Sequence, residues 1–195
     1  MALMKLAYAM CGSFCTHANA LETMRLLARE NDITPVLSEI CSVTDTRFSS
    51  AKDLLSAVTE IAGKDPVLTI PQAEETVTRG GFDALVIAPC TGNTMAKIAL
   101  GMTDTAVAMC AKAQLRSDRP VLIAPATNDG LGASFHNIGT LMNKKNVWFV
   151  PFRQDDPENK PHSLVADFSL LPDALACAVR GKQVQPVMRE LRIQN

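Results

Sequence analysis

The sequence predicts an α/β fold, in which a parallel sheet lies between helices on both faces. Short apolar runs alternate with amphipathic segments along the 195 residues. Parallel strands need long crossover connections, and the amphipathic segments provide helices for them. Two runs, 84–88 and 121–124, are apolar on both faces, as strands in the middle of such a sheet are. We expect one domain over residues 1–195, with residues 181–195 as a loosely held tail.

The elements follow in order from the hydrophobic pattern. Strands are predicted at 6–10, 33–40, 84–88, 121–124 and 147–150, with a short extended piece at 67–70. Helices are predicted at 17–30, 51–62, from 71 onwards, and at 95–100, 104–115, 131–143 and 164–180. The segment Arg153–Pro161 is polar and holds two prolines, so we expect a mobile loop there.

Composition and charge exclude several classes of protein. The formal net charge of -1 argues against nucleic acid or an anionic membrane as the main partner. No apolar run approaches the roughly 20 residues of a membrane span. The first residues, MALMKLAYAMCGSF, contain one lysine and no small-residue cleavage site, and they fit a buried strand better than a signal peptide. We therefore expect a cytoplasmic protein.

The six cysteines are an even number, which invites a disulfide interpretation. Cys11 and Cys15 flank a glycine turn, whereas the other four are scattered through apolar segments. The sequence has no CxxC pair and no histidine near a cysteine pair at zinc-ligand spacing. We expect reduced, mostly buried thiols and no metal site.

The loop after the first predicted strand is the first candidate for ligand binding. In a parallel sheet, ligands bind beyond the carboxyl ends of the strands. Gly12 allows close approach of the backbone, and the N–H groups at a helix start attract an anion. Ser13 and Thr16 add hydroxyl donors. One glycine makes neither a GxGxxG fingerprint nor a P-loop, and a plain turn with Ser13 as N-cap is the alternative.

Two further loops follow the most apolar strands. Thr91-Gly92-Asn93-Thr94 offers three side chains that can form hydrogen bonds, where a simple helix cap needs one. Thr127 and Asn128 repeat this pattern after the neighbouring strand. Because adjacent strands end at the same edge, the two loops predict one cleft for a polar ligand.

These loops carry a resemblance to a known family. Pro89-Cys90-Thr91-Gly92-Asn93-Thr94 resembles the Pro-Ala-Ser-Ala-Asn-Thr motif of the homo-oligomeric flavin-containing cysteine decarboxylase superfamily. Pro125-Ala126-Thr127-Asn128 is similar to its Pro-x-Met-Asn motif, with threonine in place of methionine. The resemblance covers roughly residues 4–152. It implies a flavodoxin-like, Rossmann-like three-layer sandwich that binds flavin mononucleotide (FMN), in a homo-oligomer built on trimers.

The resemblance also implies which residues hold the flavin. Gly12, Ser13, Phe14 and Ser38 would surround the phosphate and ribityl chain. Thr91, Gly92, Asn93 and Thr94 would hold the ribityl hydroxyls and the ring edge, with Thr127 and Asn128 beside them. The decarboxylases use a histidine that Thr44–Ser56 lacks, and Gly130–Ala133 replaces their methionine–tryptophan pair. These departures count against cysteine decarboxylation, and we interpret His17 as solvent-facing or capping.

Within the superfamily, residues 11–15 and 42–48 are most similar to a branch of B subunits from two-subunit oxidoreductases. This implies oxidation of a dihydrodipicolinate-type precursor to pyridine-2,6-dicarboxylate during sporulation, with a nicotinamide-dependent A subunit that would bring NADP. Bidentate arginines suit carboxylates, and Arg47 and Arg153 are the candidates, with solvated surface charge as the alternative for each. No catalytic residue is assigned. Another FMN-dependent reaction (decarboxylation or prenyl transfer) and a non-catalytic partner subunit remain open.

Overall fold

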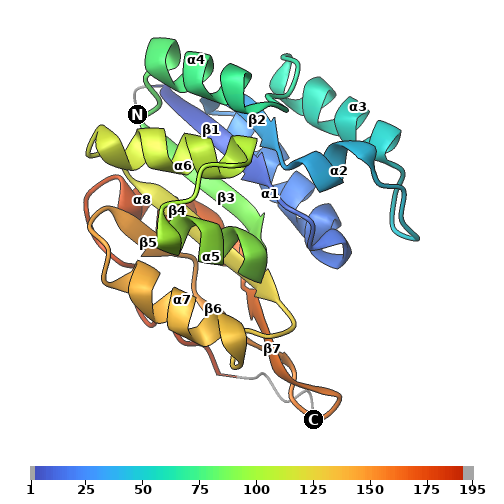
Figure 1. The fold of residues 1–195 in the computed structure, drawn as a ribbon, viewed down its shortest axis with the longest axis vertical. Coiled ribbons are helices and arrows are strands. Elements are labelled where there is room, and N and C mark those ends of the chain that lie inside the picture. The colour runs from blue at the N-terminus through green and yellow to red at the C-terminus, as the bar shows by residue number, and fades with distance from the viewer. Residues whose placement is uncertain (1–2, 191–195) are drawn as a thin grey trace.

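A seven-stranded, mostly parallel sheet forms the middle of the computed structural model, which describes residues 3–190 (Figure 1). The strand order is β2-β1-β3-β4-β7-β6, and β5 also pairs with β4. The five strands β1 to β5 run parallel, whereas β7 runs antiparallel to β4 and β6. The strands are β1 (Met4–Met10), β2 (Asn31–Leu37), β3 (Ala84–Cys90), β4 (Val121–Thr127), β5 (Val147–Phe149), β6 (Phe152–Asp156) and β7 (Lys160–Ala166).

Helices cover both faces of the sheet, which confirms the predicted fold class. One face is covered by α4 (Ile70–Gly80), α5 (Gly92–Leu100), α6 (Ala106–Arg116) and α7 (Ala133–Met142), of which α5, α6 and α7 lie in front in Figure 1. The other face is covered by α1 (His17–Ala28), α3 (Ala51–Ala62) and α8 (Leu171–Ala178). The short helix α2 (Glu39–Val43) and the 3₁₀ turns η1 (Phe14–Thr16) and η2 (Phe168–Leu170) complete the fold.

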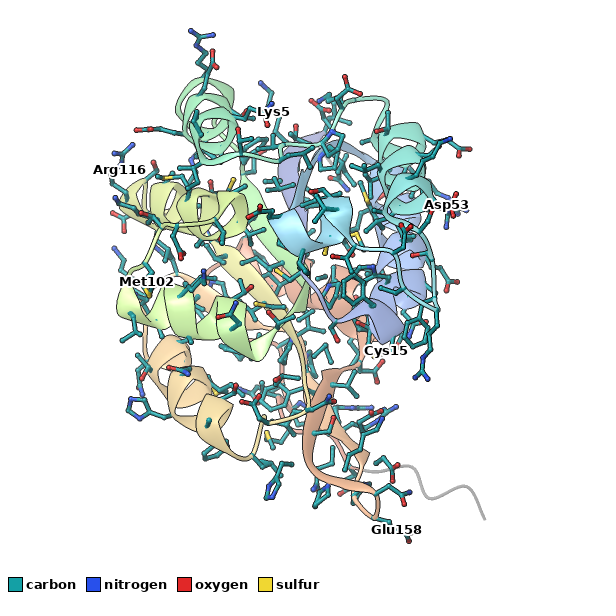
Figure 2. The ribbon with its side chains drawn as sticks, turned by 45° about the vertical axis from the view of Figure 1, so that its right-hand side comes forward. Lys5, Cys15, Asp53, Met102, Arg116 and Glu158 are labelled. Atoms are coloured by element: carbon teal, nitrogen blue, oxygen red, sulfur yellow. The ribbon has the colours of Figure 1, made fainter. Side chains whose placement is uncertain are left out.

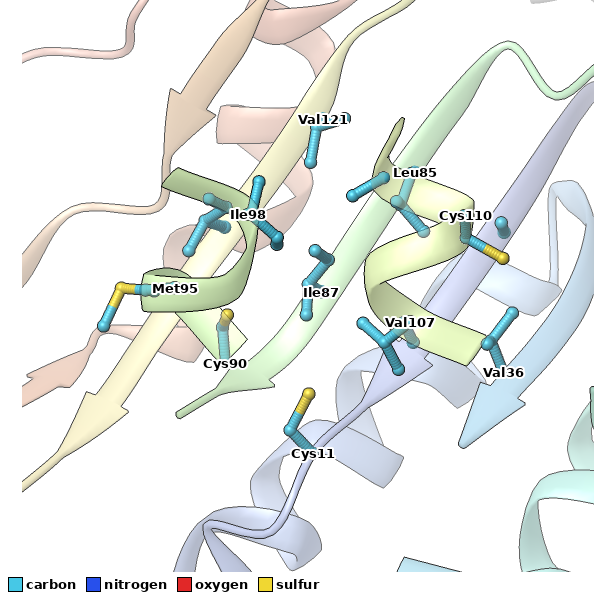
Figure 3. Packing of buried hydrophobic residues seen from close by; sticks show 14 of the residues in the cluster. Cys11, Val36, Leu85, Ile87, Cys90, Met95, Ile98, Val107, Cys110 and Val121 are labelled. Atoms are coloured by element: carbon cyan, nitrogen blue, oxygen red, sulfur yellow. The ribbon is translucent and has the colours of Figure 1, made fainter. Parts of the chain in front are cut away.

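Strand β3 lies in the middle because its sequence is apolar on both faces. All seven of its residues are buried. Ile87 packs under the α5–α6 layer, between Ile98 and Val107 in Figure 3, while Val86 faces the α1–α8 layer. Full burial of one such side chain contributes about 1.5–3 kcal/mol. The alternation of inward faces therefore orients the carboxyl end of β3 and the loop that follows it.

Local sequence sets where several helices begin. The Ser50 hydroxyl accepts from Asp53 N–H at 3.1 Å and starts α3. Thr69 and Gln72 form a capping box at α4, with Pro71 in the first turn. Thr91 caps α5. Polar residues before apolar helices therefore perform capping, and at α5 the same residue stands in the candidate cleft.

The polar segment Arg153–Pro161 is not the mobile loop predicted from sequence, and that prediction was wrong. It belongs to the β6–β7 hairpin, whose tip carries Glu158 (Figure 2). The hairpin is held because Val165 and Leu164 pair with Ala126 and Thr127 at the end of β4. This pairing joins residues almost forty positions apart, so no local pattern announces it.

Other boundaries also differ from the prediction. The strand predicted at 33–40 ends at Leu37, and Glu39–Val43 is helical. The helix predicted at 164–180 begins only at Leu171, because residues 164–166 belong to β7. Residues 183–189 run beside β5 and β6, where Val187 O accepts from Phe152 N–H at 2.9 Å. The predicted loose tail also includes residues 191–195, which lie outside the described part, so it stays a prediction.

Candidate functional site

The chain reverses direction across the sheet between β1 and β3. It passes from β1 outward to β2 and returns on the other side of β1 to form β3. Such a switch point leaves a crevice at the carboxyl ends of the two strands. The loops after β1, β2, β3 and β4 all open at this edge, and they contain the residues predicted to hold a ligand.

Direct contacts join these loops. Cys11 N–H donates to Pro89 O at 3.1 Å, and Ser38 N–H donates to Met10 O at 3.0 Å. The Thr94 hydroxyl donates to Cys11 Sγ at 3.3 Å. The loops after β1, β2 and β3 therefore form one continuous edge.

The loop after β1 keeps free hydrogen-bond donors. Within the described residues, the backbone N–H groups of Gly12 and Ser13 have no protein acceptor. The Ser13 hydroxyl has only a weak contact of 4.0 Å with Cys15 Sγ. A Cβ added to Gly12 would meet Ile40 Cγ2 at 3.1 Å, so this backbone is closely enclosed. Two free amides and a hydroxyl in a half-buried turn suit an anionic oxygen ligand.

Three other predicted residues already donate hydrogen bonds from their hydroxyl groups. The Ser38 hydroxyl donates to Cys41 Sγ at 3.2 Å, and the side chain is buried. The Thr91 hydroxyl donates a hydrogen bond to Thr94 Oγ1 at 3.1 Å, and the Thr94 hydroxyl in turn donates one to Cys11 Sγ. These groups reach a ligand as donors only after the hydroxyls turn. Asn93, in contrast, is exposed at the first turn of α5.

Gly92 brings the loop after β3 against the loop after β4. A Cβ at Gly92 would lie 2.3 Å from Ser134 Oγ, 2.8 Å from Thr127 Oγ1 and 2.9 Å from Asp129 Oδ1. These three side chains form one network, in which Thr127 Oγ1 and Ser134 Oγ both donate to Asp129 Oδ1. The hydrogen bond from Thr127, followed by that from Ser134, holds the pKa of the Asp129 carboxyl below its usual value. Asp129 therefore stays ionised. Sequence analysis did not name Asp129 as a site residue, and the only signal for it was its position in the loop after β4.

A cavity of about 300 Å³ lies beside these loops and under the β6–β7 hairpin. Of the predicted residues, Ser13, Thr127, Asn128 and Arg153 line it. Asp155, Lys160 and Ser163 also line it, and sequence analysis missed them because it treated the hairpin as a loop. Figure 2 shows Cys15, in η1, and Glu158, at the hairpin tip, in the lower half of one view.

The two predicted arginines are not brought together. Arg153 faces the cavity and pairs with Asp167 at 3.7 Å. Arg47 is exposed on the loop before α3, with its guanidinium 4.8 Å from the centre of the Phe48 ring, and it does not line the cavity. The geometry therefore favours Arg153 for contact with a ligand in this cavity.

His17 is buried, and the prediction that it faces solvent was wrong. Its exposed fraction is 4%. Nε2 lies 2.8 Å from Cys11 O, so this nitrogen carries the proton. Nδ1 has no hydrogen-bond partner among the described residues, and Phe14 packs with its ring centroid 5.1 Å away. Burial lowers the pKa of His17 from its usual value, and the bond to Cys11 opposes this. The neutral ring thus braces the loop that carries Gly12.

His17 should make the stability of the fold depend on pH. Because its folded pKa is depressed, the unfolded chain binds the extra proton first as pH falls. We expect the free energy of unfolding to drop below about pH 6.5, by at most about 1.4 kcal/mol per pH unit. His17→Gln keeps a donor for Cys11 O and should flatten this slope in urea melts. His136→Gln, at an exposed residue, should keep the slope of the natural protein; an unchanged slope in His17→Gln would contradict the assignment.

All six cysteines are free thiols, and four of them are buried. The Cys90 thiol, the Thr94 hydroxyl and the Thr91 N–H lower the pKa of Cys11, against the effect of burial. Burial raises the pKa of Cys90.

Within the described residues, no group of three histidine, cysteine or acidic side chains is arranged to hold a metal ion. No helix in this part of the chain is long and apolar enough to cross a membrane.

We compared the sequence with models of known protein families, and one family matches the part of the chain that contains these polar loops. The flavoprotein family model matches residues 6–160. The chain belongs to the flavoprotein family. The membership inferred from Thr91–Thr94 and Thr127–Asn128 is thus confirmed.

Known relatives of this flavoprotein include two B subunits. The B subunit of dipicolinate synthase from Bacillus subtilis (strain 168) is 37% identical over 187 residues, which are 95% of this chain and 94% of the relative. The crystal structure of the corresponding B subunit of dipicolinate synthase from Bacillus halodurans C has 38% identity and a TM-score of 0.88, with 97% of both chains covered. A dodecameric FMN-dependent Ubix-like decarboxylase from Escherichia coli O157:H7 shares the fold at 22% identity and a TM-score of 0.58, over 76% of this chain and 80% of that one.

Proposed function

We propose that this flavoprotein is the B subunit of a dipicolinate synthase. It would take part in oxidising a dihydrodipicolinate-type precursor to pyridine-2,6-dicarboxylate during sporulation. The observation that carries the proposal is the 37% identity to the Bacillus subtilis protein over 95% of the chain. The near-complete coverage means that β7 and α8, which lie beyond the region that the family model matches, are part of the likeness.

We propose FMN as the cofactor, because the donors at the sheet edge fit a phosphate and a polyhydroxyl chain. The free N–H groups of Gly12 and Ser13 and the Ser13 hydroxyl suit the phosphate. Asn93, Thr127 and Asn128 offer amide groups and oxygen acceptors for the ribityl chain and the ring edge, while Phe14 lies at the turn. The chemistry that a bound flavin supplies is acceptance of a hydride.

We propose that Arg153 holds one carboxylate of the substrate. Its side chain is 36% exposed and lines the cavity, and the pairing with Asp167 at 3.7 Å helps to orient the guanidinium. Arginine binds carboxylates through two parallel hydrogen bonds, which fixes the plane of the substrate. Lys160, paired with Asp155 at 3.3 Å, lies along the same cavity. A role for Arg47 in binding the substrate stays a prediction.

We further propose the A subunit of dipicolinate synthase as a partner, with NADP bound there, and a homo-oligomer built on trimers. The relatives that carry the name are B subunits, which supports the existence of a second kind of chain. The dodecameric Escherichia coli relative supports self-assembly. A cytoplasmic location is supported by the six free thiols, which persist in a reducing compartment.

The test begins with the absorbance spectrum and thermal melt of the purified full-length chain with added FMN. A ligand at a hundred times its dissociation constant stabilises a protein by about 2.7 kcal/mol, which a melt resolves. Riboflavin, which lacks the phosphate, serves as the matched ligand and should bind at least tenfold more weakly. The chain with bound FMN is then mixed with the A subunit, and pyridine-2,6-dicarboxylate is measured.

Each arm has a contrary result. A chain that stays colourless and gains no stability from FMN would overturn the cofactor assignment and leave a non-catalytic partner subunit. Equal affinities for riboflavin and FMN would show that the Gly12–Ser13 turn does not bind the phosphate. A chain that binds FMN but forms no pyridine-2,6-dicarboxylate with the A subunit would point to another flavin-dependent reaction.

A further inference from the structure

A second hollow, of about 730 Å³, lies outside the candidate cleft, between α1 and the segment from the end of β7 to α8. From α1 it is lined by Arg25 and Leu26, among others, and by Arg29, the residue that follows α1. From the other side Arg153, Phe168 and Ser169 face it. We call it the arginine hollow. Its volume lies within the range of small-molecule binding sites.

The arginine hollow has an excess of positive charge. Three arginines line it, against the two carboxylates of Glu22 and Asp167. Asp167 forms an ion pair with Arg153 at 3.7 Å. Within residues 3–190, Arg25 and Arg29 have no carboxylate within 4.0 Å. They stand four positions apart at the end of α1, where Arg29 keeps the helical backbone, so both guanidiniums are available to one ligand.

Apolar surface lies between these charges. Leu26, on the same face of α1, keeps 49% of its surface exposed. Phe168 is nearly buried and lines the hollow from the opposite side. Ser169 and Asn19 add hydrogen-bonding groups. A ligand that fits has both an anionic group for the arginines and a flat apolar group for the surface beside Leu26.

We propose that the arginine hollow binds a nucleotide, with its phosphates on Arg25 and Arg29. Planar guanidiniums bind phosphate oxygens in pairs, and a base offers the flat apolar part. Asn19, Arg153 and Ala166 line both this hollow and the cavity under the hairpin. A bound nucleotide therefore adjoins the proposed flavin cavity without sharing the Gly12–Ser13 turn. The proposal does not depend on the proposed reaction, and its test uses the FMN binding proposed above.

The test titrates ADP and, separately, inorganic pyrophosphate into the full-length chain, by calorimetry and with FMN at saturation. Bound FMN keeps ADP out of the candidate cleft, so that the ADP binding measured is binding to the arginine hollow. We expect saturable binding of ADP, with pyrophosphate weaker because it lacks the base. The double variant Arg25→Glu/Arg29→Glu should weaken ADP binding at least tenfold while FMN affinity changes less than twofold.

Lys112→Glu/Arg116→Glu is the matched control. It makes the same change in net charge on α6, which covers the opposite face of the sheet, and Arg116 is labelled in Figure 2. It should leave ADP affinity within twofold of the natural protein. No saturable ADP binding, an equal loss in both double variants, or no loss in the α1 variant would each overturn the proposal. Circular dichroism of both variants shows that the compared chains are folded.

Discussion

Replacing Gly92 with alanine is expected to abolish FMN binding and to lower the free energy of unfolding by roughly 1–3 kcal/mol, as overpacking does. The added methyl would meet Ser134 Oγ at 2.3 Å, Thr127 Oγ1 at 2.8 Å and Asp129 Oδ1 at 2.9 Å. A single short side chain could rotate away, but the side chains of Ser134, Thr127 and Asp129 are hydrogen-bonded to one another and must move together. Ser134 is buried in the first turn of α7, so the helix start moves as well.

Gly139→Ala is the matched control for Gly92→Ala. Gly139 lies in the same layer of helices, within α7, and an added Cβ meets nothing within 4 Å. Alanine should stabilise this helix by about 0.5–1 kcal/mol and leave FMN affinity unchanged. Urea unfolding and FMN titration measure both quantities. A Gly92→Ala protein with natural stability and natural affinity would show that the close approach of the two loops does not matter.

Replacing Ser13 with aspartate should weaken FMN binding at least a hundredfold and leave the fold intact. Two unit charges about 4 Å apart repel by roughly 4 kcal/mol at the effective dielectric constant of a protein surface. Ser13 is half-buried and precedes η1, where aspartate is also a favourable cap. The melting temperature of the flavin-free chain should therefore stay close to that of the natural protein.

Ser13→Asn separates charge from shape, because asparagine has the size of aspartate without the charge. We expect it to bind FMN within about tenfold of the natural chain, since a neutral contact contributes about 0.5–1.5 kcal/mol. Fluorescence quenching of FMN measures the affinities of both variants. Equal affinities of Ser13→Asp and Ser13→Asn would place the flavin phosphate away from the turn after β1.

Local pattern alone was enough to predict the parallel strands β1 to β5 and the edge where the candidate site lies. Residues 84–88 and 121–124 are apolar on both faces, and a strand with such a sequence is stable only between two layers of helices. That placement puts the polar residues which follow, Thr91–Thr94 and Thr127–Asn128, at one edge. Short-range chemistry also marked the helix starts at Ser50 and Thr91. These features depend on neighbours within a few positions, which the sequence displays directly.

The tertiary structure alone decided the hairpin, the burial of His17 and the difference between the two arginines. Residues 153–161 are polar, and they are ordered because β7 pairs with the distant end of β4. His17 is buried because Phe14 of η1 packs against it, and Cys11 O accepts a hydrogen bond from its ring. Arg153 reaches the cavity through the same hairpin, while Arg47 lies over Phe48 outside it. The hairpin and the place of Arg153 depend on contacts between segments far apart in the chain, and the burial of His17 depends on how the turn after β1 folds back. Spacing along the sequence does not contain that information.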